Sequence, residues 1–382
     1  MIFNLTILIL GLIASLYLFW RMPNLNNPLQ QDTAVESKTA AKVEPLNGSL
    51  SVSIIIPARN EAETLPLILT DLKEQTHKPL EIICVNDGSE DQTRDVILGA
   101  GDNVVLLDVS DKPIDWMGKA WACLKGAEQA KGQLLLFLDA DVRLTPESLA
   151  KLLVAYGQAS CTISVQPYHR ISKAYEQLSM FFNVILIGAN GTGLPIKNSK
   201  VGLYGPVILI PKADYEEIGG HRAAQRTITD DLALGDALTL AGKKYRLFLG
   251  GNDISFRMYG GGIRELLHGW TKNFATGAGK TPARLRILMF GWVTSCTAAP
   301  LYMIQALWTG DFTWAIAYLF FYGIWVAELN RIVPKIGNFS RASLLVYPVF
   351  MLVFLTTFCW SLWKKLFRRQ VTWKGRTMKP EA

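Results

Sequence analysis

The sequence predicts an α/β protein with a mostly parallel sheet, joined to apolar helices at both ends of the chain. Two observations lead to this prediction. From residue 51 onward, short apolar segments alternate with longer amphipathic ones, a pattern typical of βαβ units with helices on both faces of a parallel sheet. In addition, four apolar runs without a charged residue lie near the two ends of the 382-residue chain. A chain of this length can bury one large core besides such runs.

The first apolar run covers residues 1–20. It lacks a basic start and a small-residue cleavage site, so we expect an uncleaved anchor over residues 1–21, with a cleaved signal peptide as the alternative. Crossing a bilayer takes about 20 apolar residues, so two of the three later runs are long enough and the middle one is marginal. These runs cover residues 287–308, 312–327 and 343–363. We therefore expect an integral protein of the cell membrane, with C-terminal membrane segments over residues 285–363.

The composition argues against two other classes of protein. The formal net charge is +7, and the basic residues gather in the tail, residues 364–382, beside the last apolar run. A basic cluster in that position binds anionic lipid headgroups or sets topology, so we expect no nucleic-acid partner. The five cysteines lie far apart without a C-x-x-C pair, which indicates reduced thiols rather than disulfides or a zinc site.

The elements between these ends follow from local signals. Residues 22–50 are polar and aperiodic, so we expect a linker there and the α/β domain over residues 51–280. Four short apolar segments predict strands, namely 52–57, 80–86, 104–109 and 133–139. Four start signals predict the helices between them: one from Glu61, one capped near Ser89, one around 117–131 and one opened by Thr145-Pro146-Glu147.

Later segments complete the domain. Residues 204–222 are typical of a strand, a helix and a Gly-Gly stop. Residues 256–274 predict a strand and an amphipathic helix, which either lies in the membrane interface or helps to hold phosphate or acceptor, with Trp270 as an acceptor contact. The segment TGAGKT at 276–281 lacks the first glycine of a P-loop and the strand before it, so we do not expect ATP hydrolysis there.

Polar residues follow three of the predicted strands. Because carboxyl ends of parallel strands meet at one sheet edge, where ligands bind in such folds, we expect three clusters to lie together: Ala58-Arg59-Asn60-Glu61, Asn86-Asp87-Gly88-Ser89 and Asp139-Ala140-Asp141. Mg²⁺ and Mn²⁺ take one or two protein carboxylates and complete their shell with phosphate oxygens and water. We expect Asp139 and Asp141 to hold such a metal. The alternative is that these residues only return the chain to solvent.

A second acidic pair opens the helix predicted over residues 227–244. Asp230 and Asp231 are favoured there by the helix dipole, and a carboxylate in this position can also be a general base. Three basic residues precede the turn, namely His221, Arg222 and Arg226. They can supply positive charge to an acidic acceptor, or they can belong to a solvated loop.

Five motifs in this order make the chain resemble the family-2 inverting glycosyltransferases, whose nucleotide-diphospho-sugar domain has the GT-A fold. They are SIIIPARNEAETL (53–65), VNDGSEDQT (85–93), FLDADV (137–142), GPVILIPKADYEEIGG (205–220) and TDDLALG (229–235). The resemblance covers about residues 51–280. It implies that Asp231 is the base, with Asp230 beside it, and that Asp139 and Asp141 hold the metal. It also implies a donor nucleotide site that contains Pro57, Arg59, Glu61, Asp87, Lys119 and Asp139.

A narrower set of motifs resembles the membrane-bound glucosyltransferases of bacterial C30 carotenoid biosynthesis: SVQPYHR, GGHR, DDLALGDA, SFRMYGGG and GWTKNFATGA. This resemblance implies transfer of one glucose from UDP-glucose to the carboxyl group of 4,4'-diaponeurosporenoate, an apolar polyene acid. Hopanoid-associated transferases have a similar layout, so a hydroxyl of another membrane lipid, as in a hopanoid or glycolipid, is the alternative acceptor. Alternatives of other classes are an inactive membrane-anchored binder of nucleotide or lipid, and a nucleotidyltransferase.

Two motifs depart from the wider family. The Q-x-x-R-W sequence of processive polysaccharide synthases is absent, which favours a single transfer over polymer synthesis. The base motif has Asp-Asp where Glu-Asp is commoner, so the choice between Asp230 and Asp231 stays open.

The topology follows from the donor, which is cytoplasmic, so residues 51–280 are expected to face the cytoplasm in a multi-pass protein. The positive-inside tendency places the basic tail there too. Three full C-terminal crossings would leave it outside. We therefore expect one of the three C-terminal runs to lie in the interface or to re-enter, with 287–308 and 312–327 as the candidates.

Overall fold

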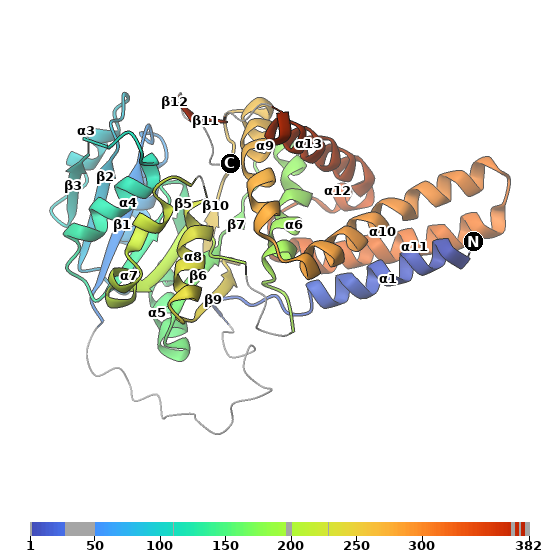
Figure 1. Ribbon diagram of the computed structural model, residues 1–382, viewed down its shortest axis with the longest axis horizontal. Coiled ribbons are helices and arrows are strands. Elements are labelled where there is room, and N and C mark those ends of the chain that lie inside the picture. The colour runs from blue at the N-terminus through green and yellow to red at the C-terminus, as the bar shows by residue number, and fades with distance from the viewer. Residues whose placement is uncertain are drawn as a thin grey trace, which may run out of the picture. The chain divides into compact units, whose positions relative to one another are not determined.

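Figure 1 shows the computed structural model, which describes residues 2–26, 50–109, 111–195, 201–227, 229–367, 371–373 and 376–378. The chain divides into two compact units. The sheet unit contains Pro23–Tyr168 and Gly202–Arg257, and the helical unit contains Met1–Met22, His169–Val201 and Met258–Met378. Most of the expected linker and part of the expected basic tail lie outside the described residues.

The sheet unit is built on a seven-stranded sheet in the order β3-β2-β1-β4-β8-β6-β9. Neighbouring strands run parallel except at β8, which is antiparallel to both β4 and β6. The expected mostly parallel sheet is therefore confirmed. The strands are β1 (Val52–Ala58), β2 (Glu81–Asn86), β3 (Val104–Asp108), β4 (Leu134–Leu138), β6 (Thr162–Gln166), β8 (Val207–Pro211) and β9 (Tyr245–Leu249). The shorter strands are β5 (Val142–Leu144), which pairs with β10 (Ile254–Phe256), and β7 (Tyr168–His169), where the chain leaves the unit.

The helices of the sheet unit agree with the expected alternation. They are α2 (Leu65–Lys73), α3 (Thr93–Leu98), α4 (Gly118–Gln129), α5 (Ser148–Ala159), α7 (Lys212–Glu217), the 3-10 helix η3 (Gly220–Ala224) and α8 (Asp230–Leu240). The helix cap expected at Ser89 is wrong, because α3 begins at Thr93 and the Ser89 hydroxyl accepts the backbone N–H of Asn60 instead. The helix expected from Glu61 starts at Leu65, after one turn closed by the Leu65 N–H on the Glu61 carbonyl.

Both faces of the sheet are buried, as alternation along a strand requires. Ile54 and Ile56 on β1 join a core cluster with Ile68 of α2. Ile55 between them faces α4, where a Cβ at Gly126 would lie 2.5 Å from the Ile55 side chain. Only a glycine lets this helix approach the strand so closely.

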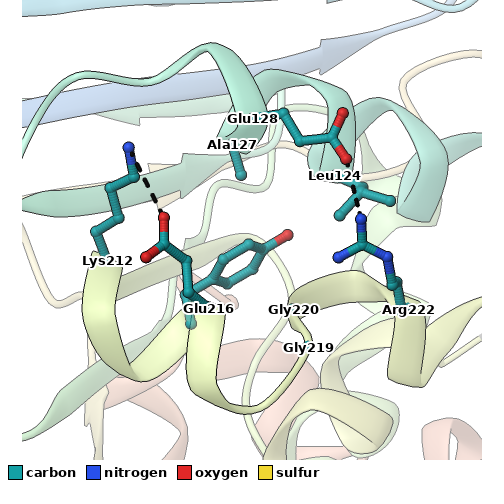
Figure 2. Close-up of a pocket in the computed structure, with 9 residues that line it drawn as sticks. Leu124, Ala127, Glu128, Lys212, Glu216, Gly219, Gly220 and Arg222 are labelled. Atoms are coloured by element: carbon teal, nitrogen blue, oxygen red, sulfur yellow. Dashed lines mark hydrogen bonds and ion pairs between the residues drawn. The ribbon is translucent and has the colours of Figure 1, made fainter.

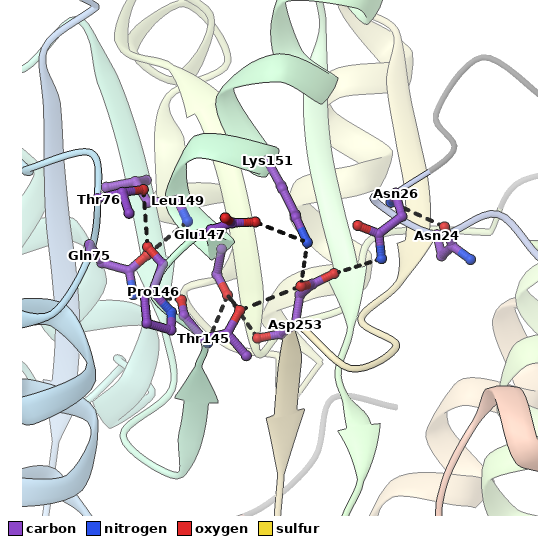
Figure 3. A network of polar contacts seen from close by, with 11 residues as sticks. Asn24, Asn26, Gln75, Thr76, Thr145, Pro146, Glu147, Leu149, Lys151 and Asp253 are labelled. Atoms are coloured by element: carbon purple, nitrogen blue, oxygen red, sulfur yellow. Dashed lines mark hydrogen bonds and ion pairs between the residues drawn. The ribbon is translucent and has the colours of Figure 1, made fainter.

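A polar network around Asp253 joins separate segments of the sheet unit (Figure 3). The Asp253 carboxylate accepts hydrogen bonds from Lys151 Nζ at 2.6 Å and from Asn26 Nδ2 at 2.9 Å. Its backbone carbonyl accepts from the Thr145 N–H at 2.9 Å and the Ser148 hydroxyl at 2.7 Å. Asp253 therefore joins the start of α5 to the segment that follows the N-terminal helix.

The helical unit contains the apolar runs. Its elements are α1 (Ile2–Leu18), η2 (Ala174–Ser179), α6 (Met180–Asn190), α9 (Ile263–Lys280), α10 (Ala283–Trp308), α11 (Phe312–Ile332), η4 (Val333–Lys335), α12 (Arg341–Leu345), α13 (Tyr347–Phe367) and the strand pair β11 (Val371–Trp373) and β12 (Arg376–Met378). Three stretches are long and apolar enough to cross a membrane: Ala283–Trp308, Phe312–Lys335 and Tyr347–Lys364. The TGAGKT segment lies largely within the helical residues of α9, which agrees with its exclusion as a P-loop.

The sequence predicts a single domain over residues 51–280, but the structure divides these residues between the two units. His169–Val201 and the segment from Met258 belong to the helical unit. The reason is the apolar α6, whose buried Phe181 and Phe182 contact Trp292 of α10 and Phe354 of α13.

The close approach of α4 to β1 leads to a stability prediction. In Gly126→Ala, the added methyl group overlaps Ile55, and overpacking of this kind costs roughly 1–3 kcal/mol of unfolding free energy. Gly99→Ala is the matched control, because the nearest atom to its new Cβ is 3.5 Å away and the backbone φ is −80°. Denaturant unfolding of the detergent-solubilised protein should show a loss for Gly126→Ala only. Equal stabilities would contradict the described packing.

Candidate active site

The sheet edge brings together the three predicted strand ends. β1 lies between β2 and β4, and the Asp87 N–H donates to the Ala58 carbonyl at 3.0 Å. The Arg59 guanidinium donates to the Asp87 carbonyl at 3.1 Å and lies 3.8 Å from the Asp87 carboxylate. Arg59 and Asp87 are both buried, while Pro57 at the end of β1 is half-buried. The geometry therefore brings Pro57, Arg59 and Asp87 together at this edge of the sheet.

Backbone turns hold this edge in place. Asn60 and Gly88 have left-handed conformations, with φ of 53° and 60°. Glu61 then donates its N–H to the Thr93 hydroxyl at 2.8 Å, which ties the loop after β1 to the start of α3. The charge of Glu61 contributes to the raised pKa values of Asp139 and Asp141, so this side chain lies close enough to act on both.

A single lysine connects the two acidic motifs. Lys119, in the first turn of α4, places Nζ 2.6 Å from Asp139 Oδ1 and 3.9 Å from Asp230 Oδ2. The side chains of Lys119 and Asp139 are both 28% exposed, so the ion pair is partly buried and still within reach of solvent. Burial raises the pKa of Asp139, although Lys119 acts in the opposite direction. Asp139 and Asp230 therefore belong to one electrostatic cluster.

Asp141 has a different environment. Its pKa is raised to about 7, first by burial and then by the charges of Asp139 and Glu61. Within the described residues, no Lys, Arg or His lies at ion-pair distance from its carboxylate. A carboxylate that is crowded by like charges gains from a divalent cation.

Metal binding by protein groups alone has little support. Among the described residues, no group of three or more His, Cys, Asp or Glu side chains is arranged to hold an ion. The two aspartates supply hard oxygen ligands that fit Mg²⁺ or Mn²⁺ only when phosphate or water completes the shell.

The start of α8 places the second acidic pair beside Lys119. A Cβ at Gly205 would lie 3.4 Å from both Asp231 Oδ2 and Lys119 Nζ, so the two groups face the same small space. Burial, and then the charge of Asp230, raises the pKa of Asp231 to about 7. α8 reaches this position because Gly202 and Gly235 let the two chain segments touch, with a Cβ at Gly235 only 2.8 Å from the Gly202 Cα.

His221 lies next to Asp230, and its imidazole ring is neutral. The backbone N–H of His221 donates to the Tyr215 hydroxyl at 3.2 Å, and the ring Nδ1 lies 2.8 Å from the same oxygen. The Nε2 atom of the ring lies 4.0 Å from Asp230 Oδ2. Burial lowers the pKa of His221 to about 4, so the ring supplies no positive charge at neutral pH.

The two neighbouring arginines are already paired. Figure 2 shows Arg222 directed at Glu128 of α4, with 3.2 Å between Nη2 and Oε1, beside a pocket of about 70 Å³. Arg226 lies 3.0 Å from Asp115. Both arginines are exposed, and the acceptor roles of His221, Arg222 and Arg226 stay predictions.

Trp270 belongs to the helical unit. It is 3% exposed, stacks on Phe182 with 4.8 Å between ring centroids, and donates to the Ser179 hydroxyl at 3.1 Å. These contacts describe a packing role, and its role in acceptor binding stays a prediction.

The pattern of residue types does not reveal Tyr215 and Gly205 as parts of the site. Tyr215 orients His221 because Gly220 has φ of 57° and leaves space for the tyrosine ring, which would lie 2.5 Å from a Cβ there. The sequence signal for this part of the site is the Gly-Gly pair before His221. The pair indicates a turn with a left-handed backbone, but it does not reveal that Tyr215 packs against this turn.

Comparison with known proteins agrees with this geometry. Residues 53–204 match the family model described as glycosyl transferase family 2. A 4,4'-diaponeurosporenoate glycosyltransferase of Staphylococcus haemolyticus is 32% identical over 333 residues, which cover 85% of this chain and 88% of that protein. The protein of the same name in Staphylococcus aureus is 32% identical over 334 residues, with the same coverage.

A solved structure shares the fold. A mannosyltransferase from Pyrobaculum calidifontis superposes with a TM-score of 0.52 at 15% identity, over 94% of this chain and 98% of that one. With the family match and the two relatives, the chain belongs to glycosyl transferase family 2 and is a glycosyltransferase with the GT-A fold.

Proposed function

We propose that this glycosyltransferase is membrane-bound and inverting, and that it moves one glucose from UDP-glucose to the carboxyl group of a C30 carotenoid acid, 4,4'-diaponeurosporenoate. The carotenoid acceptor is supported by the names of the two staphylococcal relatives. The observation that carries the site assignment is the position of Lys119 between Asp139 and Asp230, with Asp231 facing the same space.

The donor is assigned to the edge formed by β1, β2 and β4. Pro57, Arg59 and Asp87 would receive the nucleotide, and Glu61 lies beside them. Arg59 is fixed by Asp87 before any ligand binds, so its guanidinium does not have to be ordered by the donor. Lys119 would meet the diphosphate, because its ammonium group is the cation closest to Asp139.

The metal is assigned to Asp139 and Asp141. The mannosyltransferase with the same fold was solved with GDP-Man and Mn²⁺, which supports a divalent ion bound together with a nucleotide sugar. When bound, the ion would neutralise charge that develops on the leaving diphosphate. Because the metal is assigned to two carboxylates, and no group of three metal-binding side chains occurs among the described residues, the diphosphate would supply further oxygens.

The transfer step forms one bond and breaks one. The acceptor oxygen attacks the anomeric carbon from the face opposite to the diphosphate, the bond from that carbon to the phosphate oxygen breaks, and UDP leaves with the electron pair. A carboxylate acceptor loses its negative charge as the ester forms, so no proton has to be removed. Asp231 would then orient the acceptor rather than act as a base.

A hydroxyl acceptor on another membrane lipid is the second candidate, and one observation favours it. The arginines that could receive a carboxylate, Arg222 and Arg226, are paired with Glu128 and Asp115. Asp231 at the start of α8 is well placed to take a proton from an alcohol.

The product assay tests the proposed function. Purified protein is incubated with UDP-glucose and either 4,4'-diaponeurosporenoate or a hopanoid alcohol, and products are identified by mass. A polyene ester that carries one hexose supports the proposal. A glycoside of the alcohol alone would assign the second acceptor, and no hexose transfer to either would overturn both assignments.

Asp231 gives a test of the acceptor type. With a polyene acid, Asp231→Asn should lose less than the ~10²–10⁴-fold usual for a general base, and Arg222→Ala should weaken acceptor use strongly. At saturating Mn²⁺, which keeps Asp139 and Asp141 deprotonated, the wild-type rate should also change little between pH 6 and 8. A base with a pKa near 7 would instead give a rate that rises with pH, because only the deprotonated form acts. A dead Asp231→Asn enzyme beside a nearly normal Arg222→Ala enzyme would contradict the acid acceptor.

Asp141 gives a test of the metal. Asp141→Ala should abolish turnover while the unfolding curve stays near that of the wild type, because burial and like charges disfavour the ionised form of this half-buried carboxylate. Residual activity should not survive EDTA. A variant that keeps full activity in EDTA would contradict the metal assignment.

The membrane arrangement is proposed from the helical unit. α1 and α10 are antiparallel: Trp292 donates to the Ser15 hydroxyl at 3.0 Å and Ser295 to the Leu8 carbonyl at 3.1 Å. Basic residues gather where α1 and α11 end and α10 begins, namely Arg21, Lys280, Arg284, Arg286, Arg331 and Lys335. The turn between α10 and α11 carries Asp311 and no basic residue. The positive-inside tendency assigns the basic end to the cytoplasm.

α13 is the helix that we assign as re-entrant. The Tyr347 hydroxyl at its start donates to the Cys296 carbonyl at 3.0 Å, in the middle of α10, and Tyr347 stacks on Tyr322 of α11. Farther along, the Ser361 hydroxyl donates to the Thr271 carbonyl of α9, the helix that leads into the start of α10. α13 thus starts about 20 Å along α10 and returns toward the basic end (Figure 1). α13 thus replaces the apolar runs 287–308 and 312–327 as the segment proposed to re-enter the membrane.

Cysteine labelling tests this topology. In a Cys359→Ser background, Thr309→Cys in the turn between α10 and α11 should react with an impermeant maleimide on intact cells, and Lys379→Cys in the tail should react only after permeabilisation. Labelling of the tail from outside would show that α13 crosses the membrane.

A further inference from the structure

We propose that Lys119 occupies the metal-binding oxygen of Asp139 until a nucleotide diphosphate arrives, and then moves toward Asp230 and the phosphates. Lys119 would thereby make metal binding depend on donor binding. This inference rests on the proposed function of the site, since it takes Asp139 as a ligand of the metal.

The starting geometry is a pairing between a cation of the protein and the carboxylate that the metal needs. Lys119 Nζ lies 2.6 Å from Asp139 Oδ1, which is the distance of a strong charge-assisted hydrogen bond. Both side chains are 28% exposed, so a ligand can reach the pair. An arriving divalent ion would have to share Asp139 with an ammonium group at contact distance, and the two positive charges would repel each other.

A second carboxylate is ready to receive the lysine. Asp230 Oδ2 lies 3.9 Å from the same Nζ, too far for a hydrogen bond but near enough to be reached by a change of side-chain rotamer. The Nε2 of His221 lies 4.0 Å from Asp230 Oδ2. Asp230 is therefore close to both Lys119 and His221 without a hydrogen bond to either.

The backbone around this path does not need to move. Lys119 is on α4, Asp230 is on α8, and η3 packs between these helices. The small buried side chains of Ala120, Ala224 and Ala233 form the contact among the three elements. The flexible four-carbon stem of lysine can move its charge while these elements stay in place.

The inference separates the roles of the two adjacent aspartates. Asp231 faces the space beside Gly205, where the acceptor would react. Asp230 faces Lys119 and His221 and is a positioning residue that receives the displaced lysine. Before the donor binds, Lys119 acts on four acidic groups, namely Asp139, Asp141, Asp230 and Asp231.

Mn²⁺ binding to the full chain in detergent tests the exchange. Free Mn²⁺ is followed by electron paramagnetic resonance, with and without UDP. Without UDP, Lys119→Met should bind Mn²⁺ about five-fold more tightly than the wild type, because the competing ion pair is gone. With UDP, the same variant should bind the nucleotide more weakly, because a phosphate contact is lost.

Asp230→Asn should act in the opposite direction. Lys119 then loses its alternative partner and stays on Asp139, so Mn²⁺ should bind more weakly than to the wild type even with UDP. Lys125→Met is the matched control. It removes one positive charge from the same helix, at a residue that pairs with Glu128 and lies over Trp121, and Mn²⁺ binding should not change.

Two failures can be told apart. If the wild type binds no Mn²⁺ even with UDP or GDP, the metal assignment itself fails. If the wild type binds Mn²⁺ with UDP, but Lys119→Met shows unchanged or weaker binding of Mn²⁺ alone, then Lys119 does not compete with the metal. If Lys119→Met does not fold, Asp230→Asn decides the test. An Mn²⁺ affinity of Asp230→Asn equal to that of the wild type would then contradict the exchange.

Discussion

The ion pair between Lys119 and Asp139 is the interaction on which the rest of the site depends. Lys119 is the cation that neutralises the strand-end cluster, and it is fixed by α4, whose close contact with β1 depends on Gly126. Asp139 is fixed by β4 and by the pairing of its N–H with the Pro206 carbonyl. Four carboxylates share this cation within a partly buried space, so their charges are only partly compensated. Such a cluster is prepared to receive positive charge, and a metal–diphosphate complex brings positive charge together with its own ligands.

Much of the sheet unit could be predicted, because its signals are local. Alternating apolar segments define β1 to β4 and their helices, and the carboxyl ends of parallel strands must meet at one edge. Arg59, Asp87 and Asp139 were therefore identifiable as neighbours. The predicted helix start at Asp230 also holds, since the acidic first turn is visible in the sequence.

The remaining parts depend on partners distant in the sequence. Tyr215 contacts both the backbone N–H and the ring of His221 across a turn that needs Gly220 in a left-handed conformation, and no pattern of residue types reveals that pairing. Arg222 and Arg226 look like free cations in the sequence, but Glu128 and Asp115 pair with them. The separation into two units also could not be predicted, because α6 is apolar enough for either a core or a membrane-facing bundle. Its aromatic contacts decide in favour of the helical unit.

A structure of the full chain with UDP and Mn²⁺ would test the central claim most directly. In that structure the ion should contact Asp139, Asp141 and oxygens of the diphosphate, while Lys119 has left Asp139 and lies at hydrogen-bond distance from Asp230 or a phosphate. An ion bound elsewhere, or a bound ion with the contact between Lys119 and Asp139 still intact, would contradict the claim.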